Sequence, residues 1–189
     1  MMKKKLICII ILNLILLMMS FKSLSKYDYK NEPKYVHLAD NIINKTANEL
    51  KNEKRLHLIG HGGSLMYDVK KLGISFVSID EITIEEGRKL IQYCAQKFLS
   101  NINSNEQIRP YLNTVPFEAK DIDVAISFKE RDMGKNHSID FISMHYGKIV
   151  YDISDKEETL KTVHEETYDE ALKIVESEKF NKEIKSTSE

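Results

Sequence analysis

The sequence predicts an α+β fold: an antiparallel sheet of about four to five strands with three main helices packed mostly on one face. Three stretches place apolar residues every three to four positions, as amphipathic helices do when they bury one side. Residues 122–129 instead alternate strictly between apolar and polar side chains, which is typical of a strand with one buried and one solvated face. This one-sided pattern favours antiparallel pairing.

The N-terminus has the composition of a secretory signal. Three lysines precede an apolar run from Leu6 to Met19 that only Asn13 interrupts, and small or polar residues follow it. A helix of this run is about 21 Å long, short of the ~30 Å hydrocarbon core of a bilayer. We therefore expect residues 1–25 to be a signal peptide cleaved before Lys26, with an uncleaved membrane anchor as the alternative.

The chain behind this signal is mildly acidic and has one cysteine. Removing residues 1–25 removes four of the 28 basic residues and none of the 29 acidic ones, which leaves a net charge of −5. We therefore expect no nucleic-acid partner, and membrane contact only through an uncleaved signal. Cys94 is left without a cysteine partner, so the core must hold the domain together without a disulfide.

The remaining chain is expected to form one domain between two polar segments. Residues 26–33 form a linker that ends at Pro33, residues 34–180 form the single α+β domain, and residues 181–189 form a polar C-terminal tail. The apolar spacing predicts a helix from residue 35 to residue 50.

The next segment is expected to contain a glycine loop between short elements. The predictions are a short strand at residues 56–60, a loop at 60–64, a two-turn helix at 65–72 and a strand at 74–79. The loop is predicted because three of its five residues are glycines, and the helix is predicted to stop at Gly73.

The clearest helix begins at a capping box. Thr83 and Glu86 have the spacing of this motif, in which each side chain bonds the backbone N–H of the other residue. The apolar stripe that follows comprises Ile84, Gly87, Ile91, Cys94, Ala95, Phe98 and Ile102. A glycine on the stripe indicates close approach to the sheet, and Cys94 is expected to be a core residue, not a reactive thiol.

The C-terminal half is expected to be a series of strands joined by hairpins. The predictions are strands at 122–128, 139–146, 149–153 and 160–165, turns at 133–136 and Gly147-Lys148, and a last helix capped by Thr167 and Glu170. The solvated sheet face is expected to carry Asp123, Ser127 and Lys129 and, depending on register, Asp140 or His145 and Asp152.

The glycine loop is the candidate ligand site. Gly60, His61, Gly62, Gly63 and Ser64 would expose backbone N–H groups, and a helix starting at Ser64 would help them to hold an anion. The loop lacks the lysine of a phosphate-binding P-loop, and the chain lacks the G-x-S-x-G elbow of α/β-hydrolases. The favoured interpretation is structural: the glycines turn a strand into a helix and Ser64 caps it.

Metal and triad chemistry have weaker support. His57 and His61 are four residues apart, with Asp68 nearby and His145 and His164 elsewhere, but the glutamate of an HExxH motif is absent. Ser64 with His61, His145 or His164 and a carboxylate would make a triad only if the fold brought them together. We therefore assign no catalytic residue, no metal ligand and no cofactor.

A further segment connects the second helix to the best strand. This connection is expected to be rigid because it contains Arg109-Pro110-Tyr111-Leu112 and Pro116-Phe117. Arg109 could bind a carboxylate ligand, but the favoured interpretation is that it fixes the connection by a hydrogen bond. These two runs, with Gly62-Gly63 and the helix pattern at residues 86–91, resemble a family of small exported bacterial proteins that has no assigned function. The resemblance implies a single secreted domain and implies no activity.

Two functional hypotheses remain from the sequence. The favoured one is an exported binding or interaction module of the periplasm, the envelope or the secreted fraction, with a protein as its possible partner. The alternative is a small hydrolase or anion-binding enzyme that uses the Gly60–Ser64 segment. Whether the protein is an enzyme is left open, with the balance towards a binding protein.

Overall fold

The computed structural model describes residues 29–128, 139–155 and 159–187, with side chains up to residue 181. The chain divides into two units, residues 1–32 and 33–189. In the first unit the described part is a short 3₁₀ helix, η2 (Tyr29–Asn31). The expected signal peptide and the expected turn at 133–136 lie outside the described residues. Among the described helices, none combines the length and the apolar character needed to cross a membrane.

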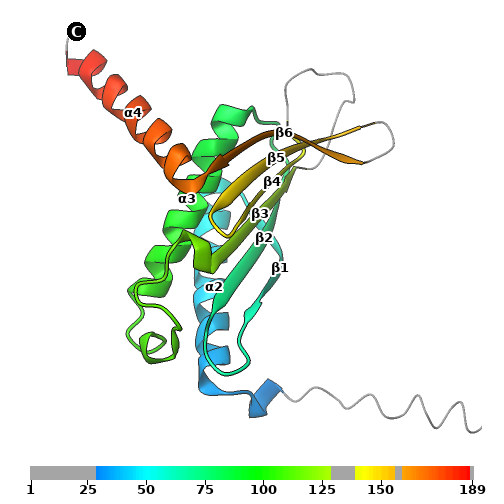
Figure 1. The fold of residues 1–189 in the computed structure, drawn as a ribbon, viewed down its shortest axis with the longest axis vertical. Helices are drawn as coiled ribbons and strands as arrows, with labels where there is room; N and C mark the ends of the chain where they lie inside the picture. The colour runs from blue at the N-terminus through cyan, green and yellow to red at the C-terminus, as the bar shows by residue number, and fades with distance from the viewer. Residues whose placement is uncertain (1–28, 129–138, 156–158, 188–189) are drawn as a thin grey trace, which may run out of the picture. The chain divides into compact units, whose positions relative to one another are not determined.

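The second unit is an α+β domain with a six-stranded sheet and three long helices (Figure 1). Its elements are α2 (Lys34–Lys54), β1 (His57–Ser64), β2 (Lys71–Ser78), α3 (Ile84–Asn103), β3 (Ile122–Phe128), β4 (Phe141–His145), β5 (Lys148–Ser154), β6 (Leu160–Thr167) and α4 (Tyr168–Thr187). The strands lie in the sheet in their chain order. The α+β class and the three helices are thus confirmed.

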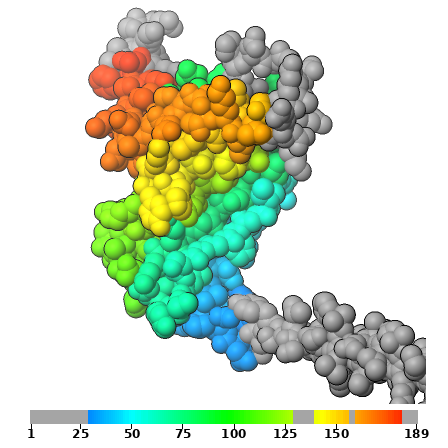
Figure 2. Space-filling model, turned by 45° about the vertical axis from the view of Figure 1, so that its right-hand side comes forward, coloured from blue at the N-terminus to red at the C-terminus, as the bar shows by residue number. Residues whose placement is uncertain are grey.

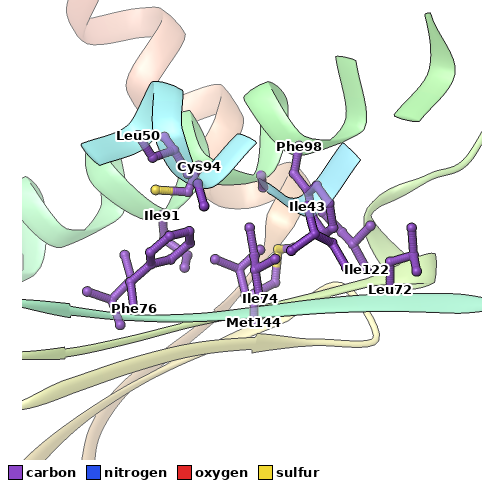
Figure 3. Close-up of a cluster of buried hydrophobic side chains, with 14 of the residues drawn as sticks. Ile43, Leu50, Leu72, Ile74, Phe76, Ile91, Cys94, Phe98, Ile122 and Met144 are labelled. Atoms are coloured by element: carbon purple, nitrogen blue, oxygen red, sulfur yellow. The ribbon is translucent and has the colours of Figure 1, made fainter. Parts of the chain in front are cut away.

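The helices lie on one face of the sheet, as the alternating sequence pattern indicated. In β2 and β3 every second residue is buried, and the residues between are only partly buried. The buried side chains fill the space between the strands and helices α2 and α3 (Figure 3). The largest of them, each less than 2% exposed, include Phe76, Phe98, Ile43, Leu50 and Ile122.

The strand count and the pairing differ from the prediction. The sheet has six strands instead of four to five, and it is mixed: β2 and β3 are parallel and all other neighbours are antiparallel. The cause is α3, which carries the chain back across the sheet between β2 and β3, so that both strands run in the same direction.

The start of α3 agrees with the sequence. The Thr83 hydroxyl accepts from the Glu86 backbone N–H at 3.3 Å, and the Glu86 carboxylate accepts from the Thr83 N–H at 2.9 Å. Gly87 faces the sheet at close range: a Cβ on it would lie 2.6 Å from Ile142 Cδ1 and 2.8 Å from Ile139 Cδ1. Cys94 is fully buried in the core.

The glycine segment is a strand, not a loop. Residues 57–64 form β1 and pair antiparallel with β2, with Gly62 opposite Gly73 and Ser64 opposite Lys71. A loop was expected because glycine has a low strand propensity. Pairing with β2 overrides this propensity. The helix expected at 65–72 is also wrong, because Val69 donates to Tyr111 O at 2.8 Å and accepts from Asn113 N at 3.0 Å, which holds it extended.

Two features of the C-terminal half are shifted by a few residues. The β4–β5 turn is centred on Tyr146 and Gly147, with φ of 50° and 73°, one position before the expected centre. Two positive φ angles are the signature of a type I′ hairpin turn. The last helix begins where Thr167 and Glu170 cap it, and α4 continues to Thr187, into the segment expected to be a polar tail.

Candidate functional site

The strand register assigns each sheet residue to one of two faces. Cross-strand partners point to the same side, so Gly60, Gly62 and Ser64 of β1 share the helix-free face with their β2 partners. We call this side the open face. Its central positions carry small or absent side chains: Gly60, Gly62, Gly73, Ser75, Ala125, Ser127 and Ser143. Figure 2 shows β1 and β2 (turquoise to teal) and β4 and β5 (yellow) at the molecular surface.

Among the polar groups on the described part of the open face is a cluster formed by Lys71, Asp123, His145 and Tyr146. His145 Nδ1 lies 2.6 Å from Asp123 Oδ1, and Lys71 Nζ donates to the same oxygen at 3.1 Å. Lys71 Nζ also lies 3.1 Å from the centroid of the Tyr146 ring. The expectation that Asp123 and Ser127 lie on the solvated face is confirmed. The register selects His145 and Asp152 for this face, but Asp152 is buried; Lys129 lies outside the described residues.

This cluster does not assemble a catalytic triad. Adjacent strands are about 4.8 Å apart, so β1 and β4, three steps apart, are separated by about 14 Å. Ser64 is therefore out of reach of His145, and His164 on β6 is farther still. His61 is paired with Ile74 and faces the helices, opposite to Ser64, where its Nδ1 lies 3.9 Å from Asp40 Oδ1.

The anion-binding and metal-binding arrangements also find no geometric support. Among the described glycines only Gly147 has a positive φ, so the Gly60–Gly63 backbone does not form the concave nest of N–H groups that an anion needs. No helix begins at Ser64. His57 and His61 point to opposite faces, and the part of the chain that the structure describes contains no group of three metal-ligating side chains.

Arg109 pins a connection, which was the favoured interpretation. It begins the short 3₁₀ helix η3 (Arg109–Tyr111), and its Nη2 donates to Asn103 O, the last residue of α3, at 3.2 Å. This bond is exposed. The same segment bonds the β1–β2 connection through Val69, so it braces the end of the hairpin rather than the glycine strand itself.

The edge of the sheet at β1 is the most exposed regular element. Within the described residues β1 pairs with β2 alone, and six of its eight residues are exposed. Three large apolar side chains of this hairpin are open to solvent: Ile59 is 62% exposed, Met66 78% and Tyr67 82%. The candidate residues Gly60 to Ser64 thus belong to one accessible edge, although in a different conformation from the one expected.

Sequence reasoning missed a buried ionic cluster between α3 and the other end of the sheet. Arg88 Nε donates to both carboxylate oxygens of Glu166, and the Tyr151 hydroxyl donates to Glu166 at 2.5 Å. Desolvation and this hydrogen bond raise the pKa of Tyr151. The available signal was the position of Arg88, four residues after Ile84 and three before Ile91, which places an arginine beside the apolar stripe of α3.

A cleft of about 780 Å³ lies between the end of α2, α3 and α4. Its walls carry ion pairs, among them Arg55 with Asp80 at 2.8 Å and Lys89 with Glu178 at 2.5 Å. Tyr93 donates to Glu53 at 2.5 Å, which raises the pKa of Tyr93 and lowers that of Glu53. Charges of both signs thus neutralise each other across this cleft, and no ligand class follows from it.

Comparisons with protein-family models, curated proteins and solved structures find no significant match to this chain. The resemblance to small exported bacterial proteins therefore stays an expectation from the sequence.

Proposed function

We propose that the protein is an exported interaction module that binds another protein through its β1–β2 hairpin. The N-terminal composition supports export, and the exposure of Ile59, Met66 and Tyr67 on one hairpin supports a protein contact. This exposure is the observation that carries the proposal. Met and Tyr are enriched at the centres of protein interfaces because they bury a large apolar area while adapting to the partner.

The geometry also favours binding over catalysis. The polar cluster on the open face is shallow, since the His145 side chain is 62% exposed, whereas enzyme sites are concave and shield the reacting groups from bulk water. The buried Arg88–Glu166 pair neutralises itself, so it has no charge left to offer a substrate. An exposed hairpin with large apolar side chains offers apolar area that a macromolecular partner can bury.

The test is site-specific crosslinking in the cells that export the protein. A photoreactive residue in place of Tyr67 should give one discrete covalent adduct. The same residue in place of Val115, which is 58% exposed on a different segment, should not. The partner found in the adduct should then bind the purified chain in calorimetry, and the double variant Ile59→Ser, Tyr67→Ser should weaken binding at least tenfold.

Two results would overturn the proposal. One is the same adduct pattern from positions 67 and 115, which would indicate random encounter. The other is turnover of ester or phosphate substrates that disappears when Ser64 or His61 is changed to alanine, because this would establish an enzyme at the glycine strand.

A further inference from the structure

We infer that β1 binds an extended segment of the partner protein as an additional strand of the sheet. The inference rests on the proposed function and names the mode and the chemical class of the ligand. Beyond β2, the described residues place no strand next to β1, so its outer side presents a row of backbone N–H and C=O groups. Such a row is satisfied by another extended backbone, which is the basis of recognition by strand addition.

The two edges of this sheet differ in how they are protected. Natural edge strands avoid unwanted pairing by carrying lysine, proline or other charged residues, or by a bulge. The β6 edge contains Lys161, Glu165 and Glu166 and has a bulge. The β1 edge contains no proline, lysine, aspartate or glutamate in eight residues, and its single irregularity lies between Leu58 and Gly60. Each edge thus has one irregularity, and the edges differ in charge: β6 carries lysine and glutamate side chains, whereas β1 carries no lysine, aspartate or glutamate.

The glycines determine which side chains the incoming strand should carry. A Cβ on Gly62 would meet nothing within 4 Å, and one on Gly60 would meet only Ser75 Cβ at 4.0 Å. Gly62 also lies opposite Gly73, so two neighbouring strands leave the open face uncovered at this point. Large apolar side chains from an added strand cover such edge glycines, because cross-strand aromatic contacts restore the packing that glycine lacks.

A second copy of this chain fits the edge less well than a foreign segment. Antiparallel partners share a face, so self-pairing of β1 must match open-face residues with open-face residues. In the central registers it would set Gly60 opposite Gly60 or Gly62 of the other copy, and the uncovered area would stay uncovered. The ligand is therefore an extended segment of another protein with bulky apolar side chains at alternate positions.

The test uses a synthetic peptide of alternating threonine and phenylalanine, flanked by lysines for solubility, and the purified exported chain. Amide hydrogen exchange measured by NMR should slow at least tenfold at alternate β1 positions when the peptide binds. A peptide with serine in place of phenylalanine should bind at least tenfold more weakly. A peptide N-methylated at alternate amides should not bind, because its backbone cannot complete the ladder.

A pair of variants completes the design. Gly62→Lys adds the protection that β1 lacks, at a position with room for a side chain, and should weaken peptide binding at least tenfold. Val163→Lys adds the same charge to the β6 edge, where Val163 is 43% exposed, and should leave binding unchanged. Circular dichroism melting of both variants confirms that they are folded.

Three outcomes overturn the inference. The first is amide exchange at β1 that does not change when the Thr/Phe peptide is added. The second is peptide binding by the Gly62→Lys variant that equals binding by the unchanged chain. The third is a dimer in sedimentation that Gly62→Lys breaks, which would assign the edge to a second copy. If the partner crosslinked through position 67 still binds while β1 exchange is unchanged, strand addition alone is wrong. If crosslinking through position 67 also yields no partner, the proposed function is wrong as well.

Discussion

Arg88 and Glu166 form a buried ion pair between residues 78 positions apart in the chain. Arg88 Nε donates to the two carboxylate oxygens at 2.8 and 2.9 Å, and the two side chains are 11% and 5% exposed. Tyr151 donates a further hydrogen bond to the same carboxylate. The pair joins α3 to β6, so it fixes the last strand of the sheet beneath the helix layer.

Glu166→Gln should destabilise the protein strongly. The substitution leaves the Arg88 charge buried without its partner, and breaking a buried pair in this way costs about 3 kcal/mol or more of the free energy of unfolding. Urea denaturation measures the loss. The control is Glu165→Gln on the same strand, whose pair with Lys148 is half-exposed and should contribute less than about 1 kcal/mol. Equal losses would mean that the buried pair contributes no more to stability than the half-exposed one.

Alanine at Gly63 should destabilise the protein, whereas alanine at Gly62 should leave its stability nearly unchanged. A Cβ on Gly63 would lie 2.4 Å from the Lys71 backbone oxygen, which cannot move without breaking the hairpin, so Gly63→Ala should cost about 1–3 kcal/mol. A Cβ on Gly62 meets nothing within 4 Å, so Gly62→Ala should change stability by less than about 0.5 kcal/mol. Thermal melting of the two variants measures the difference in stability. Similar melting temperatures would contradict the strand geometry of β1.

Cys94 should be inert to thiol reagents in the folded protein. It is fully buried, and desolvation raises the pKa of its thiol to about 12, so the reactive thiolate is absent at pH 8. A chromogenic disulfide reagent should therefore label the exported chain only at the rate of unfolding, and completely in urea. Fast labelling of the native protein would show that the core around α3 opens.

Stability should fall in alkaline solution, and Cys94 should account for the first part of the fall. The unfolded thiol ionises near pH 9.0, whereas the folded thiol does so near 12, so rising pH favours the unfolded state between these values. The slope is about 1.4 kcal/mol per pH unit for one group. The tyrosines with raised pKa values begin to contribute only near pH 10, their unshifted value. The variant Cys94→Ala should therefore remove most of the slope between urea titrations at pH 8.5 and 9.5. An unchanged slope would assign it to other groups.

The exported chain should begin at Lys26. Cleavage after Ser25 removes the apolar run, and intact-mass spectrometry of protein recovered from the culture medium or the periplasm gives the N-terminus directly. A mass that includes Met1 would contradict cleavage and favour the membrane-anchored alternative.

The parts of the fold that the sequence predicted well are those that local interactions determine. The Thr83–Glu86 capping box, the α3 stripe and the alternation in β3 each depend on neighbours within a few residues. Gly87 was also interpreted correctly, because a glycine among large apolar residues at helical spacing indicates close packing.

The errors concern segments whose structure comes from distant partners. Residues 60–64 have the composition of a loop, and only pairing with β2 makes them a strand. The direction of β3 relative to β2 depends on the path of α3, which no local pattern records. The expected conformation of the candidate residues Gly60 to Ser64 was wrong for the same reason, because their strand structure depends on pairing with β2.

The parallel pairing of β2 with β3 also affects how the protein folds. Strands β3 to β6 meet through successive antiparallel neighbours, whereas the first contact of the parallel pair joins Leu72 to Ile122, about fifty positions away. Contacts between such distant residues form later than hairpins, because a longer chain must be closed first. We therefore expect the C-terminal strands to nucleate the sheet and the β1–β2 arm to dock last, which leaves β1 available to a partner even while the chain is still folding.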